Sequence, residues 1–190
     1  MSLKDKEKWN AKYGASACLT GREPSDWLVD HAHLLPGKGK ALDIAMGEGR
    51  NTLFAASLGY DVLGVDISDV GVSRAESLAR ENKLTIRTRI ADLDQYQIEE
   101  NAYDLILCFY FLDRNLFKKI RNGLKPGGLL VFETFNEDYL QYSSFKPEWV
   151  LKKNELPETF SDLNILDYRE VDDPENQTAY ASLVARKDVS

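Results

Sequence analysis

The chain of 190 residues has few of the side chains that bind metals or form disulfides. Its two cysteines, Cys18 and Cys108, lie far apart, and its two histidines, His31 and His33, would project from different faces of a helix. Such an arrangement provides neither a disulfide framework nor the spacing of a metal site. We therefore predict that the protein holds no metal.

Long apolar runs and an excess of positive charge are also missing. No run approaches the roughly 18 apolar residues of a membrane span, and the first residues lack a stretch of signal-peptide length. Lysine and arginine number 24 against 31 acidic residues, a net charge of -7, which is a poor electrostatic match for nucleic acid. We expect a cytoplasmic protein that binds neither membrane nor nucleic acid; the oligomeric state stays open.

What the sequence does have is a regular alternation of short apolar runs and helical segments. Strands are expected at 41–45, 61–65, 86–90, 103–109 and 129–134, and helices at 50–58, 68–82 and 116–124. Alternation of this kind gives right-handed βαβ units in a doubly wound sheet. Two further runs, 163–171 and 178–185, flank a turn-rich connector and predict an antiparallel hairpin. The predicted fold is a Rossmann-like α/β domain over residues 1–190, with seven strands, mostly parallel.

Two segments lie outside this alternation. Residues 1–35 are expected to form a helical cap, in which Trp9 and Tyr13 share one helix face. Residues 135–163 are rich in aromatic side chains and are expected to form a lid over a substrate, although these aromatics could equally belong to the core.

Two carboxylates mark the expected site. Asp43 ends the first strand and Asp66 ends the second, which places both at the sheet edge where open α/β folds bind nucleotides. An acid on the first strand is unusual for a site that receives phosphates. It indicates a nucleoside cofactor without a pyrophosphate, and S-adenosylmethionine is the predicted one. The alternative, an NAD-dependent oxidoreductase, would need a glycine where the chain has Thr52.

The turn after the first strand contains two glycines and lies beside the two carboxylates. Gly47 and Gly49 lack a Cβ and accept positive φ, so the backbone there can approach a ligand closely, although a tight turn without a ligand would look the same. Asp66 could accept hydrogen bonds from both ribose hydroxyls, or could simply favour a helix N-terminus. Asp43 would lie near the cationic methionine end of the cofactor.

Several segments together resemble a known family. The βα units, the Lys125-Pro-Gly-Gly128 turn and the terminal hairpin are similar to class I S-adenosylmethionine-dependent methyltransferases over nearly the whole chain. The family motif Asp-x-Gly-x-Gly-x-Gly reads Asp43-Ile-Ala-Met-Gly-Glu-Gly49 here, with Ala45 in place of the first glycine. Other segments resemble the tellurite-resistance (TehB-like) branch of small-molecule methyltransferases: Gly47-Glu-Gly-Arg-Asn51, Gly59-Tyr-Asp-Val62, Lys12-Tyr13, Gly21-Arg-Glu-Pro-Ser25 and Ala181-Ser-Leu-Val-Ala-Arg-Lys187.

The resemblance implies a set of cofactor contacts: Tyr13, Arg22, Asp43, Ala45, Gly47, Arg50, Asn51, Asp66, Ile67, Asp92, Leu93 and Phe109. Within this set, Asp92 would meet the amine of adenine, although Asp94 is a competing choice and Asp92 could be an ordinary loop acid. Arg22 or Arg50 would meet the methionine carboxylate. The candidates for contact with a substrate are Tyr110, Arg114 and Tyr139, and Arg114 could equally be a surface residue at a helix start.

The reaction implied by the resemblance is methyl transfer to a small molecule by in-line displacement. The leaving group is neutral and needs no acid, and proximity and alignment supply much of the catalysis. For this reason no catalytic residue is named, and the acceptor stays unidentified. The alternative is a protein that binds S-adenosylmethionine without turning it over, which the departure at Ala45 keeps open.

Overall fold

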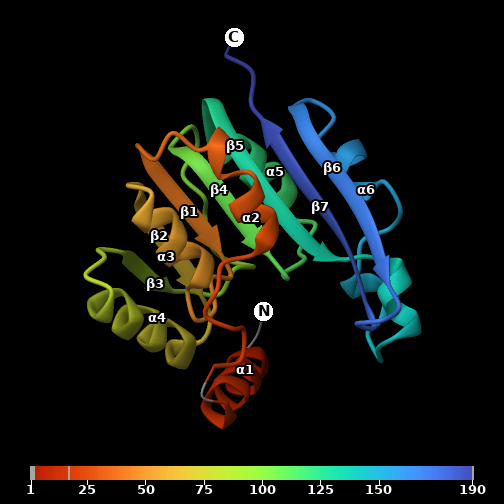
Figure 1. Ribbon diagram of the computed structural model, residues 1–190, viewed down its shortest axis with the longest axis horizontal. Helices are drawn as coiled ribbons and strands as arrows, with labels where there is room; N and C mark the ends of the chain where they lie inside the picture. Colours follow the sequence, from red (N-terminus) through yellow and green to blue (C-terminus); the bar gives the residue numbers. More distant parts are fainter. Residues whose placement is uncertain (1–2, 17, 190) are drawn as a thin grey trace.

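The computed structural model describes residues 3–16 and 18–189, and these form one seven-stranded sheet covered by helices on both faces (Figure 1). Along the sheet the strand order is β3-β2-β1-β4-β5-β7-β6. The strands are β1 Lys40–Ile44, β2 Asp61–Asp66, β3 Arg87–Ile90, β4 Tyr103–Phe109, β5 Leu124–Phe135, β6 Asn164–Asp173 and β7 Thr178–Arg186.

Six α-helices and three short 3₁₀ helices are present in the described part of the chain. They are α1 Leu3–Ala15, α2 Asp26–Asp30, η1 Ala32–Leu34, α3 Arg50–Ser57, α4 Asp69–Glu81, α5 Leu116–Gly123, η2 Glu137–Gln141, η3 Pro147–Trp149 and α6 Glu155–Thr159. In Figure 1, α2 and α3 lie in front of the sheet and α5 behind it. None of the helices in the described part of the chain is long and apolar enough to cross a membrane.

Strand pairing confirms the predicted fold class. β1 pairs in parallel with β2 and with β4, and the parallel part extends to β3 on one side and β5 on the other. β7 then pairs antiparallel with both β5 and β6, which makes the terminal hairpin. The chain passes from β1 outward to β3 and then returns to β4 beside β1. This reversal of direction between β1 and β4 is the place where open α/β sheets bind ligands.

The core lies in two layers, one on each face of the sheet. On one face Phe117 of α5 and Phe160 beyond α6 pack on Phe132 of β5. On the other, Leu28 of α2 and Ala55 of α3 belong to a second buried cluster. Full burial of each large apolar side chain contributes roughly 1.5–3 kcal/mol. These two layers hold the carboxyl ends of β1, β2 and β4 at a fixed spacing.

Two local expectations were wrong. The Lys125–Gly128 segment, expected as a turn, lies inside β5, because Leu124 already pairs with Tyr103 and Gly127 absorbs the irregularity at φ 79°. Toward the end of the helical cap expected at 1–35, α2 ends at Asp30 and a separate 3₁₀ turn, η1, follows.

Candidate active site

The turn between β1 and α3 forms the floor of the site. Its backbone has positive φ at Ala45 (57°), Gly47 (55°) and Gly49 (83°). A Cβ on Gly47 would stand 2.6 Å from the Tyr13 hydroxyl oxygen, so only glycine allows that approach. Ala45 does carry a Cβ in this left-handed region, where non-glycine residues are strained by about 1–3 kcal/mol.

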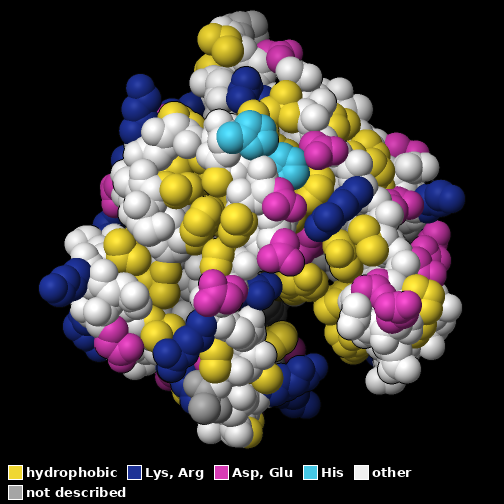
Figure 2. Space-filling view, viewed as in Figure 1, with side chains coloured by type: hydrophobic (Ala, Val, Ile, Leu, Met, Phe, Trp, Pro, Cys, Tyr) yellow, Lys and Arg dark blue, Asp and Glu magenta, His cyan; other side chains and the backbone are white. Residues whose placement is uncertain are grey.

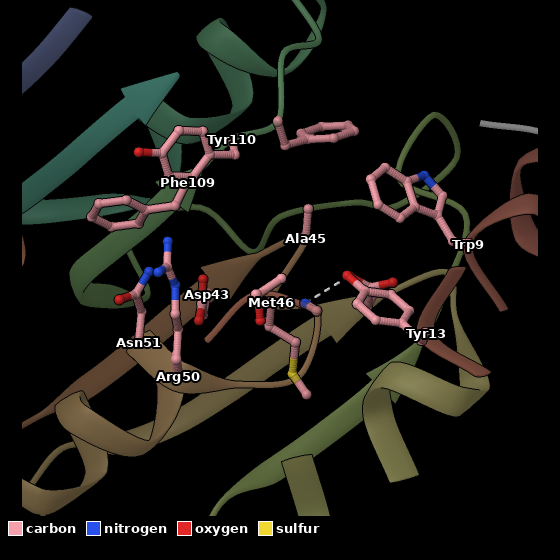
Figure 3. A pocket seen from close by; sticks show the side chains of 13 residues that line it. Trp9, Tyr13, Asp43, Ala45, Met46, Arg50, Asn51, Phe109 and Tyr110 are labelled. Carbon is pink, nitrogen blue, oxygen red and sulfur yellow. Dashed lines mark hydrogen bonds between the residues drawn. The ribbon is translucent and has the colours of Figure 1, made fainter. Parts of the chain in front are cut away.

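Met46, the neighbour of Ala45, points away from the rings of Trp9 and Tyr110 (Figure 3). Gly64 of β2 makes room for it, because a Cβ there would lie 1.9 Å from the Met46 sulfur. Gly64 therefore leaves room for the Met46 side chain beneath the turn, while Ala45 and Met46 both line the cavity.

Asp66, at the end of β2, is tied to the glycine turn. The backbone N–H of Gly47 donates to its Oδ2 and the backbone N–H of Ser68 to its Oδ1, each at 2.8 Å. The side chain is buried, and this burial raises the pKa of its carboxyl above the usual value. Two backbone donors fix the orientation of the carboxylate and leave its remaining lone pairs for a ligand.

Asp43, in β1, is the second buried carboxylate. The Thr52 hydroxyl donates to its Oδ2 at 2.6 Å. Its pKa is raised to about 7, mainly by burial and also by the nearby Asp66, while the Thr52 hydrogen bond and Arg50 oppose the rise. Neither Asp43 nor Asp66 forms an ion pair with a described residue. A buried acid without a counter-charge favours a cationic ligand and disfavours a phosphate.

These groups face one cavity of about 100 Å³ (Figure 3). It is lined by Trp9, Tyr13, Thr20, Asp43, Ala45, Met46, Gly47, Arg50, Asn51, Asp66, Phe109, Tyr110 and Phe111. Ligand sites usually measure roughly 300–1,000 Å³. This one is smaller, and Trp9 and Tyr13 of α1 form part of its wall.

Helix α1 is fastened over this cavity by Asn10. The Asn10 Oδ1 accepts a 2.6 Å hydrogen bond from the Ser68 hydroxyl, and its Nδ2 donates to Asp69 at the start of α4. Lys6 adds an ion pair to Asp69 at 3.5 Å. Figure 2 shows the surface hollowed between α1, at the bottom of the view, and the lobe at lower right that contains the tip of the β6–β7 hairpin.

The segment after α1 is held by a third carboxylate, Glu48, which lies between the two glycines of the turn. Its Oε2 accepts the backbone N–H groups of Leu19 (2.8 Å) and Thr20 (3.0 Å), and its Oε1 forms an ion pair with Arg74 at 2.7 Å. The glycine turn therefore forms the floor of the cavity. Through Glu48 it also holds Leu19 and Thr20, in the segment that follows α1.

A second cavity of about 320 Å³ shares Arg50 and Tyr110 with the first. Its other lining residues include Arg22, Ser25, Trp27, Glu133, Arg169 and Tyr180. Tyr110 follows β4 directly, has φ 53°, and stands between the two cavities. The Tyr110 ring also lies 5.8 Å from the Arg50 guanidinium.

The structure brings most of the predicted residues together. Those that line the first cavity are Tyr13, Asp43, Ala45, Gly47, Arg50, Asn51, Asp66, Phe109 and Tyr110. Arg22 lines the second cavity instead. Ile67, Asp92 and Leu93 line neither; Leu93 is fully buried in the core, and Asp92 accepts the backbone N–H of Asp94 at 3.0 Å.

Two of the substrate candidates lie outside both cavities. The Arg114 guanidinium binds both carboxylate oxygens of Glu155 and donates to the carbonyls of Glu148 and Val150. Tyr139 stacks on Phe135 with ring centroids 4.0 Å apart. The geometry gives both side chains structural partners within the 135–163 segment.

Sequence reasoning missed Glu48, Glu133 and Phe111. Glu133 had a usable signal, since it is the only charged residue in the apolar run from Leu129 to Phe135. Phe111 had none, because its place at the cavity depends on how the chain turns after Tyr110. Within residues 3–16 and 18–189 no group of three or more His, Cys, Asp or Glu side chains could hold a metal ion.

Comparison with known proteins agrees with this geometry. Residues 41–128 match a family described as a methyltransferase domain. The chain is 30% identical over 152 residues to the probable S-adenosyl-L-methionine-dependent methyltransferase TehB of Haemophilus influenzae, covering 75% of this chain and 52% of that protein. A ubiquinone biosynthesis O-methyltransferase of Burkholderia thailandensis is 29% identical over 123 residues, 62% of this chain and 52% of that enzyme.

Among solved structures, TehB from Haemophilus influenzae superposes with a TM-score of 0.72 at 24% identity, covering 96% of this chain and 67% of that one. The chain thus has the class I methyltransferase fold and is similar in sequence to TehB, as the sequence motifs predict. The TehB relative is described as dependent on S-adenosyl-L-methionine. The chain spans about half the length of the curated relatives that it matches.

Proposed function

We propose that this chain transfers the methyl group of S-adenosylmethionine to a small-molecule acceptor. The observation that carries the proposal is the pair of buried carboxylates, Asp43 and Asp66, which face one cavity beside a glycine turn and form no ion pair with a described residue. A cationic nucleoside complements this arrangement, whereas a pyrophosphate would be repelled.

Different residues of the site are suited to bind the ribose, the methionine and the adenine moieties of S-adenosylmethionine. Asp66 would accept the ribose hydroxyls, and the backbone of Gly47 would border the methionine end. Arg50 is available for the methionine carboxylate because it forms no ion pair or hydrogen bond with a described residue. Asp92 and Ile67 follow β3 and β2 at the same sheet edge, and we assign them to the adenine.

S-adenosylmethionine supplies an electrophilic methyl group on a sulfonium. The protein's part is to align an acceptor in line with that methyl group and to keep water out. Phe109, Tyr110 and Phe111 at the end of β4 border the space where an acceptor would lie. Alignment of this kind can contribute about 7–11 kcal/mol at best, without a general acid or base.

Calorimetric titration with S-adenosylhomocysteine tests the cofactor assignment. Asp66→Asn should weaken binding by roughly 10- to 100-fold, because a charge-assisted hydrogen bond contributes about 1.5–3 kcal/mol. Asp61→Asn, at the other end of the same strand, is the matched control, since Asp61 is exposed and pairs with Arg87. Full affinity in Asp66→Asn would remove the ribose role, and no binding to the wild type would remove the proposed function.

A second measurement separates an enzyme from an inactive binding protein. Release of S-adenosylhomocysteine from S-adenosylmethionine should depend on an acceptor drawn from a panel of thiols, small amines, phenols and inorganic anions. Tight cofactor binding without turnover of any panel member would favour the inactive alternative.

A further inference from the structure

Glu133 is a buried carboxylate in the middle of an apolar strand, and the fold itself gives no reason for it. It lies in β5 with 3% of its surface exposed, among Phe132, Val131 and Thr134. A buried charge is costly unless its surroundings satisfy it completely, and an apolar side chain would serve the core as well. Such groups occur mainly where a site needs a group fixed in place.

The partners of Glu133 come from four separate parts of the chain. Its Oε1 accepts the hydroxyls of Tyr110 (3.0 Å) and Ser25 (3.2 Å). Its Oε2 accepts the Ser182 hydroxyl at 2.7 Å and lies 3.5 Å from the Arg169 guanidinium. Every partner donates, so the carboxylate is held in one orientation.

Tyr110 is the one partner that faces both cavities. Its backbone is held at φ 53°, a strained conformation for a tyrosine, and its N–H donates to the Glu133 carbonyl at 2.7 Å. Strained residues at the border of a cavity commonly have a role in the site. Because the phenol proton is committed to Glu133, the oxygen has only lone pairs to offer a ligand.

We propose that Tyr110, oriented by Glu133, positions the methyl acceptor by accepting a hydrogen bond from it, and that the acceptor is therefore a protic nucleophile: a thiol, an amine or a hydroxyl compound. This inference rests on the proposed function. Glu133 acts through Tyr110 and is a positioning residue. Burial and the neighbouring Glu133 raise the pKa of the Tyr110 phenol, so it keeps its proton and does not serve as a base.

The step balances with no further reactant. The acceptor's lone pair forms the bond to the methyl carbon, the carbon–sulfur electron pair returns to sulfur, and the acceptor's proton leaves to solvent. The second cavity, which Tyr110 also lines, offers that proton a polar route.

The charges around the second cavity argue against a purely anionic acceptor. Three arginines line it, Arg22, Arg50 and Arg169, but three carboxylates do as well: Glu23, Asp26 and Glu133. Arg169 is further engaged by the ring of Trp27, at 4.4 Å from its centroid. The balanced charge leaves hydrogen bonding, rather than a net positive field, as the means of recognition.

The test compares wild type, Tyr110→Phe and the control Tyr168→Phe. Tyr168 also donates its hydroxyl to a glutamate, Glu170, but lies on the edge strand β6 outside both cavities. Cofactor affinity is measured by titration with S-adenosylhomocysteine. Acceptor recognition is measured twice: by KM and kcat in the release assay, and by ligand-observed NMR of a thiol, an amine and a phenol added to the S-adenosylhomocysteine complex.

We expect Tyr110→Phe to raise the acceptor KM by about 3- to 10-fold and weaken the NMR-detected binding equally, with cofactor affinity and kcat nearly unchanged. Glu133→Gln should have the same effect because it releases the phenol, and Tyr168→Phe should have none. Methylation of iodide alone, equal acceptor recognition by Tyr110→Phe, or no turnover of any protic acceptor by a protein that binds S-adenosylhomocysteine would each overturn the inference. Failure to bind S-adenosylhomocysteine would instead overturn the proposed function.

Discussion

The Thr52 hydroxyl in the first turn of α3 donates a 2.6 Å hydrogen bond to the Asp43 carboxylate in β1. Position 52 is where a dinucleotide-binding turn would carry a glycine. In this chain the same position secures an acid instead, and that acid is fully buried with a pKa of about 7.

Asp43→Asn should change how stability depends on pH. The folded state holds the Asp43 proton up to about pH 7, whereas the unfolded chain releases it near 3.8, so the free energy of unfolding of the wild type falls as pH rises between these values. Asparagine cannot ionise, so the variant should gain about 2 to 3 kcal/mol relative to wild type between pH 5 and pH 8. Urea denaturation of the cofactor-free protein at both pH values measures this difference.

Asp162→Asn is the control for that comparison, since Asp162 is exposed and pairs with Arg121. If the gap between wild type and Asp43→Asn were the same at pH 5 and pH 8, the raised pKa of Asp43 would be refuted.

Ala45→Gly should stabilise the protein. Ala45 has φ 57°, and glycine relieves the strain of a Cβ in the left-handed region, for a net gain of about 1 kcal/mol. Ala56→Gly, inside α3, should lose about as much, because glycine is a poor helix former. Thermal unfolding of the two variants should therefore shift in opposite directions, and a loss of stability in both would contradict the role of strain at Ala45.

Asn10→Ala should accelerate release of the cofactor. It removes both hydrogen bonds that fasten α1 to Ser68 and Asp69, and we expect the dissociation rate of S-adenosylhomocysteine to rise roughly tenfold. Stopped-flow fluorescence can follow this through Trp9, which lines the cavity. Glu7→Ala changes an exposed residue of the same helix and should leave the rate as it is. Equal rates in all three proteins would mean that α1 does not gate the cavity.

Arg114→Leu should act on stability. Its guanidinium joins Glu155 to two backbone carbonyls, and loss of this cluster should cost about 2 kcal/mol of unfolding free energy, with unchanged affinity for S-adenosylhomocysteine. Urea denaturation and calorimetry measure the two quantities. If the variant were as stable as wild type but had a raised acceptor KM, Arg114 would have a role in substrate binding instead.

The parallel sheet could be predicted because its signals are local. Each strand is a short apolar run, each helix follows it within a few residues, and Asp43 and Asp66 end neighbouring strands, so their meeting follows from the topology alone. The same reasoning placed Tyr110 at the cavity, because it comes directly after β4.

What could not be predicted depends on contacts between distant segments. Arg114 and Tyr139 have the chemistry of ligand-binding residues, but Glu155 and Phe135 engage them, and no sequence pattern announces those pairings. Glu133 accepts hydrogen bonds from Ser25, which is 108 residues away in the sequence, and from Ser182, which is 49 residues away. The pattern of apolar residues identifies a buried strand. It does not identify which polar groups will form hydrogen bonds with a buried carboxylate in that strand.

The bonds from Glu48 to Leu19 and Thr20 have a consequence for how the chain divides. The segment that matches the methyltransferase-domain family begins at residue 41, yet a fragment that started there would leave this carboxylate with Arg74 as its one remaining partner among the described residues. Residues 19 and 20 thus help to hold the glycine turn. Deleting or exchanging them should disturb that turn, so a graft of residues 41–128 onto a relative would have to include them as well.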